Sequence, residues 1–441
     1  MPGKIVFHGK EYKTLGDMPP ELRAAYEQAA GLSDGSGPAL AELEATQRSL
    51  GPIQHMDLTS RGMVRAHHDL GAEVGRQVEV ILESKIASLD PAQLAQEVRH
   101  ARHSQSAILR RLSSRRIHGR LRWALREYLR CLSAWAGGAQ LGAFGGRALR
   151  DLRVDGLPVS ADDLAFLLQN ESTGCQTGVF REDDRSVILW HTEEDRGTQA
   201  HSRFDMLRLA SFKGTENRRS RVITAFIYPD LLPGSAFGWA DNSYVQAVDA
   251  FYLRPQGDSS GVPANAVAWI CLLLAGGIPS AEIAEALAPF NGGYAITSVS
   301  RTESSLCTQT TEFVASTVVS TPLPDAPGSA RFQVNLLSDQ ASRAASENED
   351  IHPDLRRAQE RRLARTRRAL KVIARSPDRL AGFSRLLASR VGGGFAYCNK
   401  DVKAHFLCRM TMEGASMWVG AGPAVRPDGL LPSAWTRDSG V

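Results

Sequence analysis

Apolar positions recur at steps of three and four residues in the first third of the chain. They occupy Leu121, Leu125, Tyr128, Leu132 and Trp135. This is the spacing of one face of an amphipathic helix, and Asp90 followed by Pro91 is typical of a helix start. We therefore predict a long helical stretch from Asp90 onward. The preceding residues, 51 to 89, have a mixed pattern that favours no single element.

After Gly137 and Gly138 the pattern changes to short runs rich in β-branched and aromatic residues, with turn residues between them, which predicts strands. The predicted strands cover residues 186–190, 221–228, 246–253, 294–300, 312–320, 331–337, 404–410 and 416–420. Further helices are predicted over 265–277, 280–290 and 353–375. Helices first, then many strands with helices inserted, indicate an α+β fold with layered sheets.

The first 50 residues have the pattern of an appended segment. KIVFHGKEYKTL predicts a short strand pair, PPELRAAYEQAA a helix and LSDGSGPA a linker. We therefore divide the chain into an N-terminal segment, 1–50, and one larger unit, 51–441.

Composition narrows the class of protein. Of the 441 residues, 43% are apolar and 23% charged, which is typical of globular proteins and excludes a wholly disordered or collagen-like chain. Arginine is dense over 99–130 and 356–379, but no nucleic-acid motif accompanies it, so we interpret these stretches as solvated helix faces and predict no nucleic-acid partner.

The longest apolar run, 267–278, is too short to span a bilayer. With no signal peptide in the N-terminal sequence, we predict a cytoplasmic protein without a membrane partner.

Candidate chemistry centres on one cysteine. The six cysteines are widely spaced without a CxxC, and no P-loop, dinucleotide, GxSxG or HExxH motif occurs, so we predict neither metal nor cofactor. Cys175 lies in NESTGCQTGVFREDDRSVILWHTEED (170–195), which predicts a β-hairpin with the cysteine at its start. Because a hairpin returns the chain to where it began, Glu193, Glu194 or Asp195 is expected near Cys175.

The residue before the cysteine, Gly174, suggests a route to activation. Glycine tolerates the strained backbone that a thiol needs to attack its own preceding carbonyl. If the Gly174–Cys175 bond breaks, the new α-amine has an ordinary pKa near 8 and can act as base for the adjacent thiol.

Several segments, in their order along the chain, carry a resemblance to a known family. They are WAGGAQLGAF, LPVSADDLAFLLQN, the Gly174–Cys175 pair, RSVILWHTEED, VITAFIYPDLLPGSAFGWADNS, GVPANAVAWICLLLAGGIPSAEIAEAL, NGGYAIT and FQVNLL. Together they cover about residues 55 to 435. The sequence resembles the acyl-coenzyme A:6-aminopenicillanic acid acyltransferase-like, peptidase-type family of N-terminal nucleophile hydrolases.

This resemblance implies a four-layer αββα N-terminal nucleophile sandwich with a helical N-terminal part. It also implies self-cleavage at Gly174–Cys175 into fragments 1–174 and 175–441, which stay associated; residues 51–174 are the part of the first fragment that belongs to the catalytic unit. Cys175 would then be the nucleophile and form an acyl-enzyme. Asp195, or Glu194 after a shift of one residue, would orient the amine, and Asn335 would stabilise the oxyanion.

Other positions match the family pattern less fully. Asn242, in the segment that matches the family's oxyanion strand pair, lacks the family's following glycine. The family's helical arginine corresponds to Arg357 or Arg361. His191 is interpreted as a strand-end surface residue, with a pocket residue as the alternative.

The resemblance implies an amide or acyl-thioester substrate: a small molecule or peptide, with acyl-coenzyme A as a donor, in natural-product metabolism. Hydrolysis and acyl transfer both remain open. The alternative is an uncut, catalytically silent relative, a binding or scaffold protein whose first 50 residues dock to a partner.

Overall fold

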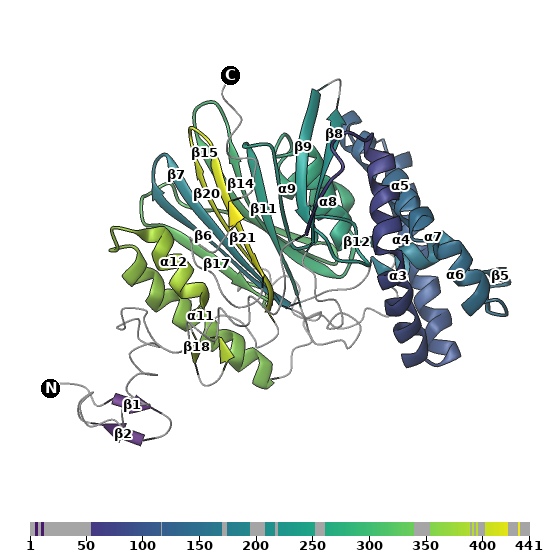
Figure 1. Ribbon diagram of the computed structural model, residues 1–441, viewed down its shortest axis with the longest axis horizontal. Coiled ribbons are helices and arrows are strands. Elements are labelled where there is room, and N and C mark those ends of the chain that lie inside the picture. The colour runs from purple at the N-terminus through teal and green to yellow at the C-terminus, as the bar shows by residue number, and fades with distance from the viewer. Residues whose placement is uncertain are drawn as a thin grey trace.

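In the computed structural model, the predicted α+β class is confirmed: mixed helices and antiparallel sheets form the molecule (Figure 1). Figure 1 shows helices α11 and α12 on one side of the strands and helices α3 to α8 on the other. The structure describes residues 5–7, 10–12, 54–115, 117–169, 174–194, 208–216, 219–251, 261–338, 353–388, 390–391, 394–395, 402–421 and 431–432.

The larger sheet has eight strands. In spatial order they are β16 (Thr317–Pro322), β15 (Leu306–Val314), β14 (Gly293–Arg301), β11 (Tyr244–Ala250), β10 (Phe237–Ala240), β9 (Arg219–Phe226), β8 (Arg208–Glu216) and β3 (Gln54–Asp57). Neighbours pair antiparallel, except that β3 runs parallel to β8.

The smaller sheet has six strands and contains the predicted hairpin. In spatial order they are β17 (Ala330–Val334), β6 (Gly174–Asp183), β7 (Ser186–Glu194), β20 (Val402–Thr411), β21 (Ala415–Ala421) and β22 (Leu431–Pro432). All its pairs are antiparallel.

Short pairs of strands complete the β structure. They are β1 (Ile5–Phe7) with β2 (Lys10–Tyr12), β4 (Arg153–Val154) with β5 (Leu157–Pro158), β12 (Val262–Pro263) with β13 (Phe290–Asn291), and β18 (Arg390–Val391) with β19 (Gly394–Phe395). The β1–β2 pair confirms the strand pair expected near the N-terminus. The expected helix over 19–30 and linker over 32–39 lie outside the described residues.

The two large sheets pack face to face. Alternate residues of each strand point inward, so one face of β6 and β7 meets one face of the larger sheet. Their shared core includes Val179, Val187 and Leu189 from the hairpin and Phe237, Trp239 and Val245 from the larger sheet. The rings of Phe237 and Phe406 stack across it with centroids 4.7 Å apart.

Helices cover the outer faces of both sheets. On the smaller sheet, α11 (Pro353–Ile373) and α12 (Arg379–Ala388) pack against Phe180, Ile188 and Trp190. On the larger sheet, α8 (Ala264–Leu274) and α9 (Ser280–Leu287) form the adjacent layer. None of the described helices combines the length and apolar composition that crossing a membrane requires.

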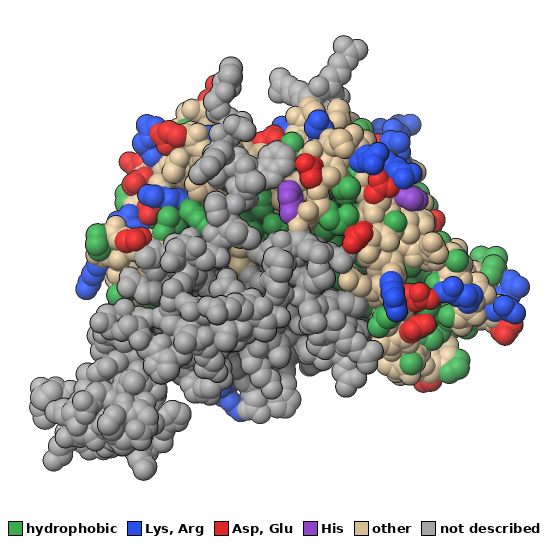
Figure 2. Space-filling view, viewed as in Figure 1, with side chains coloured by type: hydrophobic (Ala, Val, Ile, Leu, Met, Phe, Trp, Pro, Cys, Tyr) green, Lys and Arg blue, Asp and Glu red, His purple; other side chains and the backbone are tan. Residues whose placement is uncertain are grey.

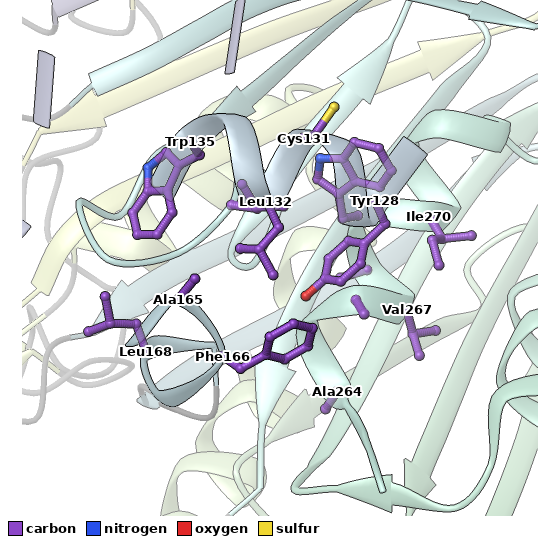
Figure 3. Close-up of a cluster of buried hydrophobic side chains, with 14 of the residues drawn as sticks. Tyr128, Cys131, Leu132, Trp135, Ala165, Phe166, Leu168, Ala264, Val267 and Ile270 are labelled. Carbon is purple, nitrogen blue, oxygen red and sulfur yellow. The ribbon is translucent and has the colours of Figure 1, made fainter. Parts of the chain in front are cut away.

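The remaining helices pack on α8 and its sheet. They are α3 (Met63–Ser88), α4 (Pro91–Ser113), α5 (Gly119–Gly138), α6 (Leu141–Ala148) and α7 (Ala161–Leu168). Figure 3 shows the core they share, where Tyr128, Leu132 and Trp135 of α5 lie with Phe166 of α7 and Val267 of α8.

Three sequence expectations need correction or refinement. The stretch predicted from Asp90 is two helices, α4 and α5, and Asp90 caps the first with a capping box. Residues 63–88, which showed no clear pattern, form α3. The single strand predicted over 312–320 is wrong, because Ala315, at φ 50°, turns the chain between β15 and β16.

Basic side chains of the helical layer lie among acidic ones. On the face shown in Figure 2, blue and red groups are interspersed over these helices. Within the first arginine-dense stretch, Arg99 pairs with Asp155, Arg102 with Asp163 and Arg130 with Glu127. These pairs support interpreting the stretch as a solvated, charge-compensated face.

Candidate functional site

The β6–β7 hairpin brings four polar side chains to one end of the core between the sheets. Cys175 pairs with Glu193 in the hairpin register, and Thr177 pairs with His191. Residues two apart on a strand point the same way, so all four share the inner face. Further along the hairpin, the same face enters the apolar core between the sheets.

Cys175 lies directly against the carboxylate of Glu193. Its Sγ is 3.3 Å from both Oε1 and Oε2, and both side chains are buried. The hydroxyl of Tyr228 donates to Glu193 Oε1, and His191 Nε2 lies 2.8 Å from Oε2. A buried carboxylate needs such partners to offset its desolvation. The arrangement therefore holds a proton acceptor beside the thiol.

His191 is part of this cluster, so its interpretation as a surface residue is wrong. The ring is fully buried, and its Nδ1 lies 2.8 Å from Thr177 Oγ1. Thr177 and Glu193 therefore hold the imidazole at both nitrogens. This leaves the ring a fixed orientation between the two strands.

A second buried acid, Asp249 of β11, lies close to the hairpin. Burial raises the pKa of Asp249 to about 7, and the charge of His191 opposes that rise. Such a group is protonated and neutral over much of the acidic range. The site therefore contains two carboxyl groups in different environments.

Asn335, just after β17, reaches the backbone of the predicted nucleophile. Its Oδ1 accepts a hydrogen bond from Cys175 N at 3.3 Å, and its Nδ2 donates to Ala250 O at 2.7 Å. Asn335 is buried. It thus links the start of β6 in the smaller sheet to the end of β11 in the larger one.

Asn242 does not join the cluster, which corrects the expectation that it serves the oxyanion. It lies in the turn that precedes β11, whereas Asn335 bonds the last residue of β11, Ala250. A strand rises about 3.3 Å per residue, so the two ends of β11 are separated by about 20 Å. The length of this strand therefore keeps Asn242 from Cys175.

The helix α11 holds the two candidates for the helical arginine and a third arginine beside them. Arg357 and Arg361 are exposed, whereas Arg362 is buried. Arg362 donates to Gln359 at 3.0 Å, and its charge lowers the pKa of Asp249, against the effect of burial. Apolar residues at Leu370 and Ile373 continue the face of Arg362 at helical spacing, and this periodicity could have identified it.

Helix α11 also contacts β6 on the face of the strand that points away from the sulfur of Cys175. Gln176, next to Cys175, points outward and donates to Thr366 Oγ1 of α11 at 3.1 Å. Both side chains are buried. This contact fixes the start of β6 from the side away from the sulfur.

The structure places Glu193, one of the three acids expected near the cysteine, beside its sulfur. Glu194 pairs with Gly174, one position before the cysteine, so the hairpin register favours Glu193 over Glu194. Asp195, which was expected to orient the amine, lies outside the described residues.

Cys175, His191 and Glu193 also form a possible set of metal ligands. Their sulfur, nitrogen and oxygen atoms lie within 4.8 Å of one another. Thiolate, imidazole and carboxylate are the donors that Zn²⁺ takes in proteins.

The other described cysteines lie apart from this chemistry. Burial raises the pKa of the thiols of Cys131, Cys271 and Cys408, which pack in apolar cores. Cys307 is exposed, and Cys398 lies outside the described residues. Among the cysteines that the structure describes, Cys175 is the one beside both a carboxylate and an imidazole.

Neither a scan against models of known protein families nor a search of curated proteins finds a match for this chain.

Proposed function

We propose that this chain is a self-cleaving N-terminal nucleophile enzyme. It cuts itself between Gly174 and Cys175, then acts as an acyltransferase or amidohydrolase through an acyl-Cys175 intermediate. The observation that carries the proposal is the contact of Cys175 Sγ with the buried Glu193 carboxylate, 3.3 Å from each oxygen. A nucleophile and a proton acceptor within reach of each other are the signature of covalent catalysis.

The packing of the chain supports the proposed family. Helices α11 and α12, the six-stranded sheet, the eight-stranded sheet and helices α8 and α9 follow one another in contact. This succession agrees with the αββα sandwich that the resemblance implies. Cys175 is the second residue of an inner strand, β6, near its start, as the nucleophile of such a fold would be.

Self-cleavage would proceed as an N-to-S acyl shift. Glu193 takes the proton of the Cys175 thiol, and the thiolate attacks the carbonyl carbon of Gly174. The C–N bond breaks as the leaving nitrogen gains a proton, which gives a thioester and a free α-amine. Water then hydrolyses the thioester, which releases the Gly174 carboxylate and restores the thiol.

After the cut, the α-amine of Cys175 would serve as base for its own thiol. Asn335 Oδ1 already accepts from this nitrogen, so it would hold the amine in place. Its Nδ2 is engaged by Ala250 O, so we assign Asn335 to positioning the amine, in place of the expected oxyanion role. Glu193 takes the orienting role first assigned to Asp195.

The two fragments, 1–174 and 175–441, would remain associated because residues 51–174 of the first share one core with the second. Tyr128 and Trp135 precede the cut and pack in the same cluster as Val267 and Ile270, which follow it (Figure 3). Separation would expose these side chains to water, at a free-energy cost of about 25 cal/mol per Å² of apolar surface.

We propose the substrate class that the resemblance implies, an amide or an acyl thioester.

Intact mass spectrometry and a denaturing gel test the proposal. Cleavage predicts fragments of about 19 and about 29 kDa from a 47.9 kDa chain of 441 residues. Cys175→Ala should remain intact, whereas Cys408→Ala, which alters another buried cysteine of the same sheet, should still be cut. A full-length band that persists on long incubation and matches Cys175→Ala would instead favour the uncut binding or scaffold protein.

A further inference from the structure

The cluster at the start of the hairpin has a second capacity. We propose that Cys175, His191 and Glu193 bind one thiophilic divalent cation, Zn²⁺, through the cysteine sulfur, the Nε2 of the histidine and a carboxylate oxygen. The proposed metal binding is independent of the proposed function, whereas the effect of the metal on self-cleavage rests on it.

The spacing of the three donor atoms is close to what the ion needs. In tetrahedral Zn²⁺ sites, with bonds of about 2.0 to 2.3 Å, ligand atoms lie about 3.3 to 3.6 Å apart. Here Sγ lies 3.3 Å from each carboxylate oxygen, Nε2 lies 2.8 Å from Oε2, and all three ligand atoms fall within 4.8 Å of one another. Small side-chain shifts on a rigid hairpin therefore suffice to admit the ion.

Two of the three ligands already have an outer partner. Thr177 Oγ1 lies 2.8 Å from His191 Nδ1, which directs the other ring nitrogen, Nε2, toward the ion. The Tyr228 hydroxyl donates to Glu193 Oε1 and holds the carboxylate from that side, while Oε2 would exchange its present contact with His191 Nε2 for the ion. Such outer hydrogen bonds orient the ligands of protein metal sites and commonly change affinity 10- to 100-fold.

Charge and burial favour a dication here. With the thiol deprotonated, Cys175 and Glu193 together carry two negative charges, and both are buried. Two adjacent buried anions repel strongly in a medium of low dielectric constant, and a divalent cation between them cancels that repulsion.

Zn²⁺ on the sulfur would oppose self-cleavage. A thiolate bound to the ion donates one of its electron pairs to the metal, which makes it a much weaker nucleophile toward the Gly174 carbonyl. Metal binding and self-cleavage therefore compete for the sulfur of Cys175. Zinc would hold the chain in its uncut form until the ion is removed.

Cobalt titration of the full-length protein tests the site directly. Chelator-treated protein should bind one Co²⁺ per chain with a thiolate-to-cobalt charge-transfer band, and Zn²⁺ should displace it. Cys175→Ala should abolish the band and Cys408→Ala should leave it unchanged. The isosteric Thr177→Val should weaken Zn²⁺ binding about 10- to 100-fold. A missing band, or one that survives Cys175→Ala, overturns the site.

A measurement without substitutions covers the case in which a variant misfolds. One equivalent of Zn²⁺ should protect Cys175 from alkylation, read by peptide mass spectrometry, while the exposed Cys307 reacts as before. Alkylation of Cys175 at an unchanged rate would contradict the proposal. If the chain shows the charge-transfer band but never cleaves, the metal site is supported and the proposed enzyme is rejected. If the chain cleaves but binds no metal, the proposed enzyme is supported and the metal site is rejected.

Discussion

The sulfur of Cys175 faces the carboxylate of Glu193 across the β6–β7 hairpin, at 3.3 Å from each of its oxygens. This pairing depends on a bulge near the turn. Asp183 pairs with Ser186, which by simple counting would place Cys175 opposite Glu194. The register shifts between Arg181 and Asp183, so the extra residue there moves the partner by one position.

Glu193→Gln should slow self-cleavage by about 10²- to 10⁴-fold, the usual contribution of a general base. The amide preserves the shape of the side chain but cannot take the thiol proton. The rate of fragment appearance by intact mass spectrometry gives the comparison. Glu194→Gln and Asp195→Asn are the matched controls, and cleavage that depends on Asp195 instead would reject the role of Glu193.

Asn335→Ala should lower the free energy of unfolding by about 1 to 3 kcal/mol, because Cys175 N and Ala250 O are left without their partner. Urea denaturation of a cleavage-blocked Cys175→Ala background measures this loss. Asn242→Ala, the same substitution at the other end of β11, should change stability much less. Equal losses in the two variants would contradict the assigned contacts.

The contribution of His67 to stability should fall as the pH is lowered from about 6.5 to about 4. Burial lowers the pKa of His67 to about 4, and its ring accepts from Trp269 Nε1 at 3.3 Å. Between these pH values the unfolded chain binds a proton that the native ring excludes, so acid favours unfolding by about 3 kcal/mol. His405, whose pKa burial lowers to about 3, adds a slope of the same sign. Asp249, whose pKa burial raises to about 7, binds a proton in the native state before the unfolded chain does, so it adds a slope of the opposite sign.

Urea denaturation of His67→Gln at several pH values checks this slope. The variant should lose the His67 part of the pH dependence, while His103→Gln, at an exposed position of α4, should keep it. If the free energy of unfolding of His67→Gln depends on pH as steeply as that of the unsubstituted protein, protonation of this ring does not cause the loss of stability in acid.

Gly138→Ala should destabilise the protein by about 1 to 3 kcal/mol or more through overpacking. A Cβ at Gly138 would lie 2.0 Å from His68 O, where α5 crosses α3. A Cβ at Gly137 meets no atom within 4 Å, so Gly137→Ala should stabilise α5 by about 0.5 to 1 kcal/mol. Thermal unfolding of the two variants gives the comparison, and equal shifts would contradict the close crossing.

The α3–α5 crossing also shows why the sequence did not reveal α3. Glycine weakens a helix pattern, and α3 contains Gly71 and Gly75. A Cβ at Gly71 would lie 2.1 Å from Trp135 O of α5, so the glycine serves a contact with a distant helix. Local propensity does not report such contacts.

The sequence alone determined the α+β class, the hairpin and the position of Cys175 at the start of that hairpin. These features depend on strand periodicity and turn residues, which act locally. The partner of the cysteine was decided only by tertiary structure. Glu182, the extra residue of the bulge, accepts hydrogen bonds from Arg409 of β20 and Arg379 of α12, 227 and 197 residues further along the chain. Since a register shift of one residue exchanges the two faces of a strand, the bulge places Glu193 opposite the sulfur, and distant parts of the chain contact that bulge.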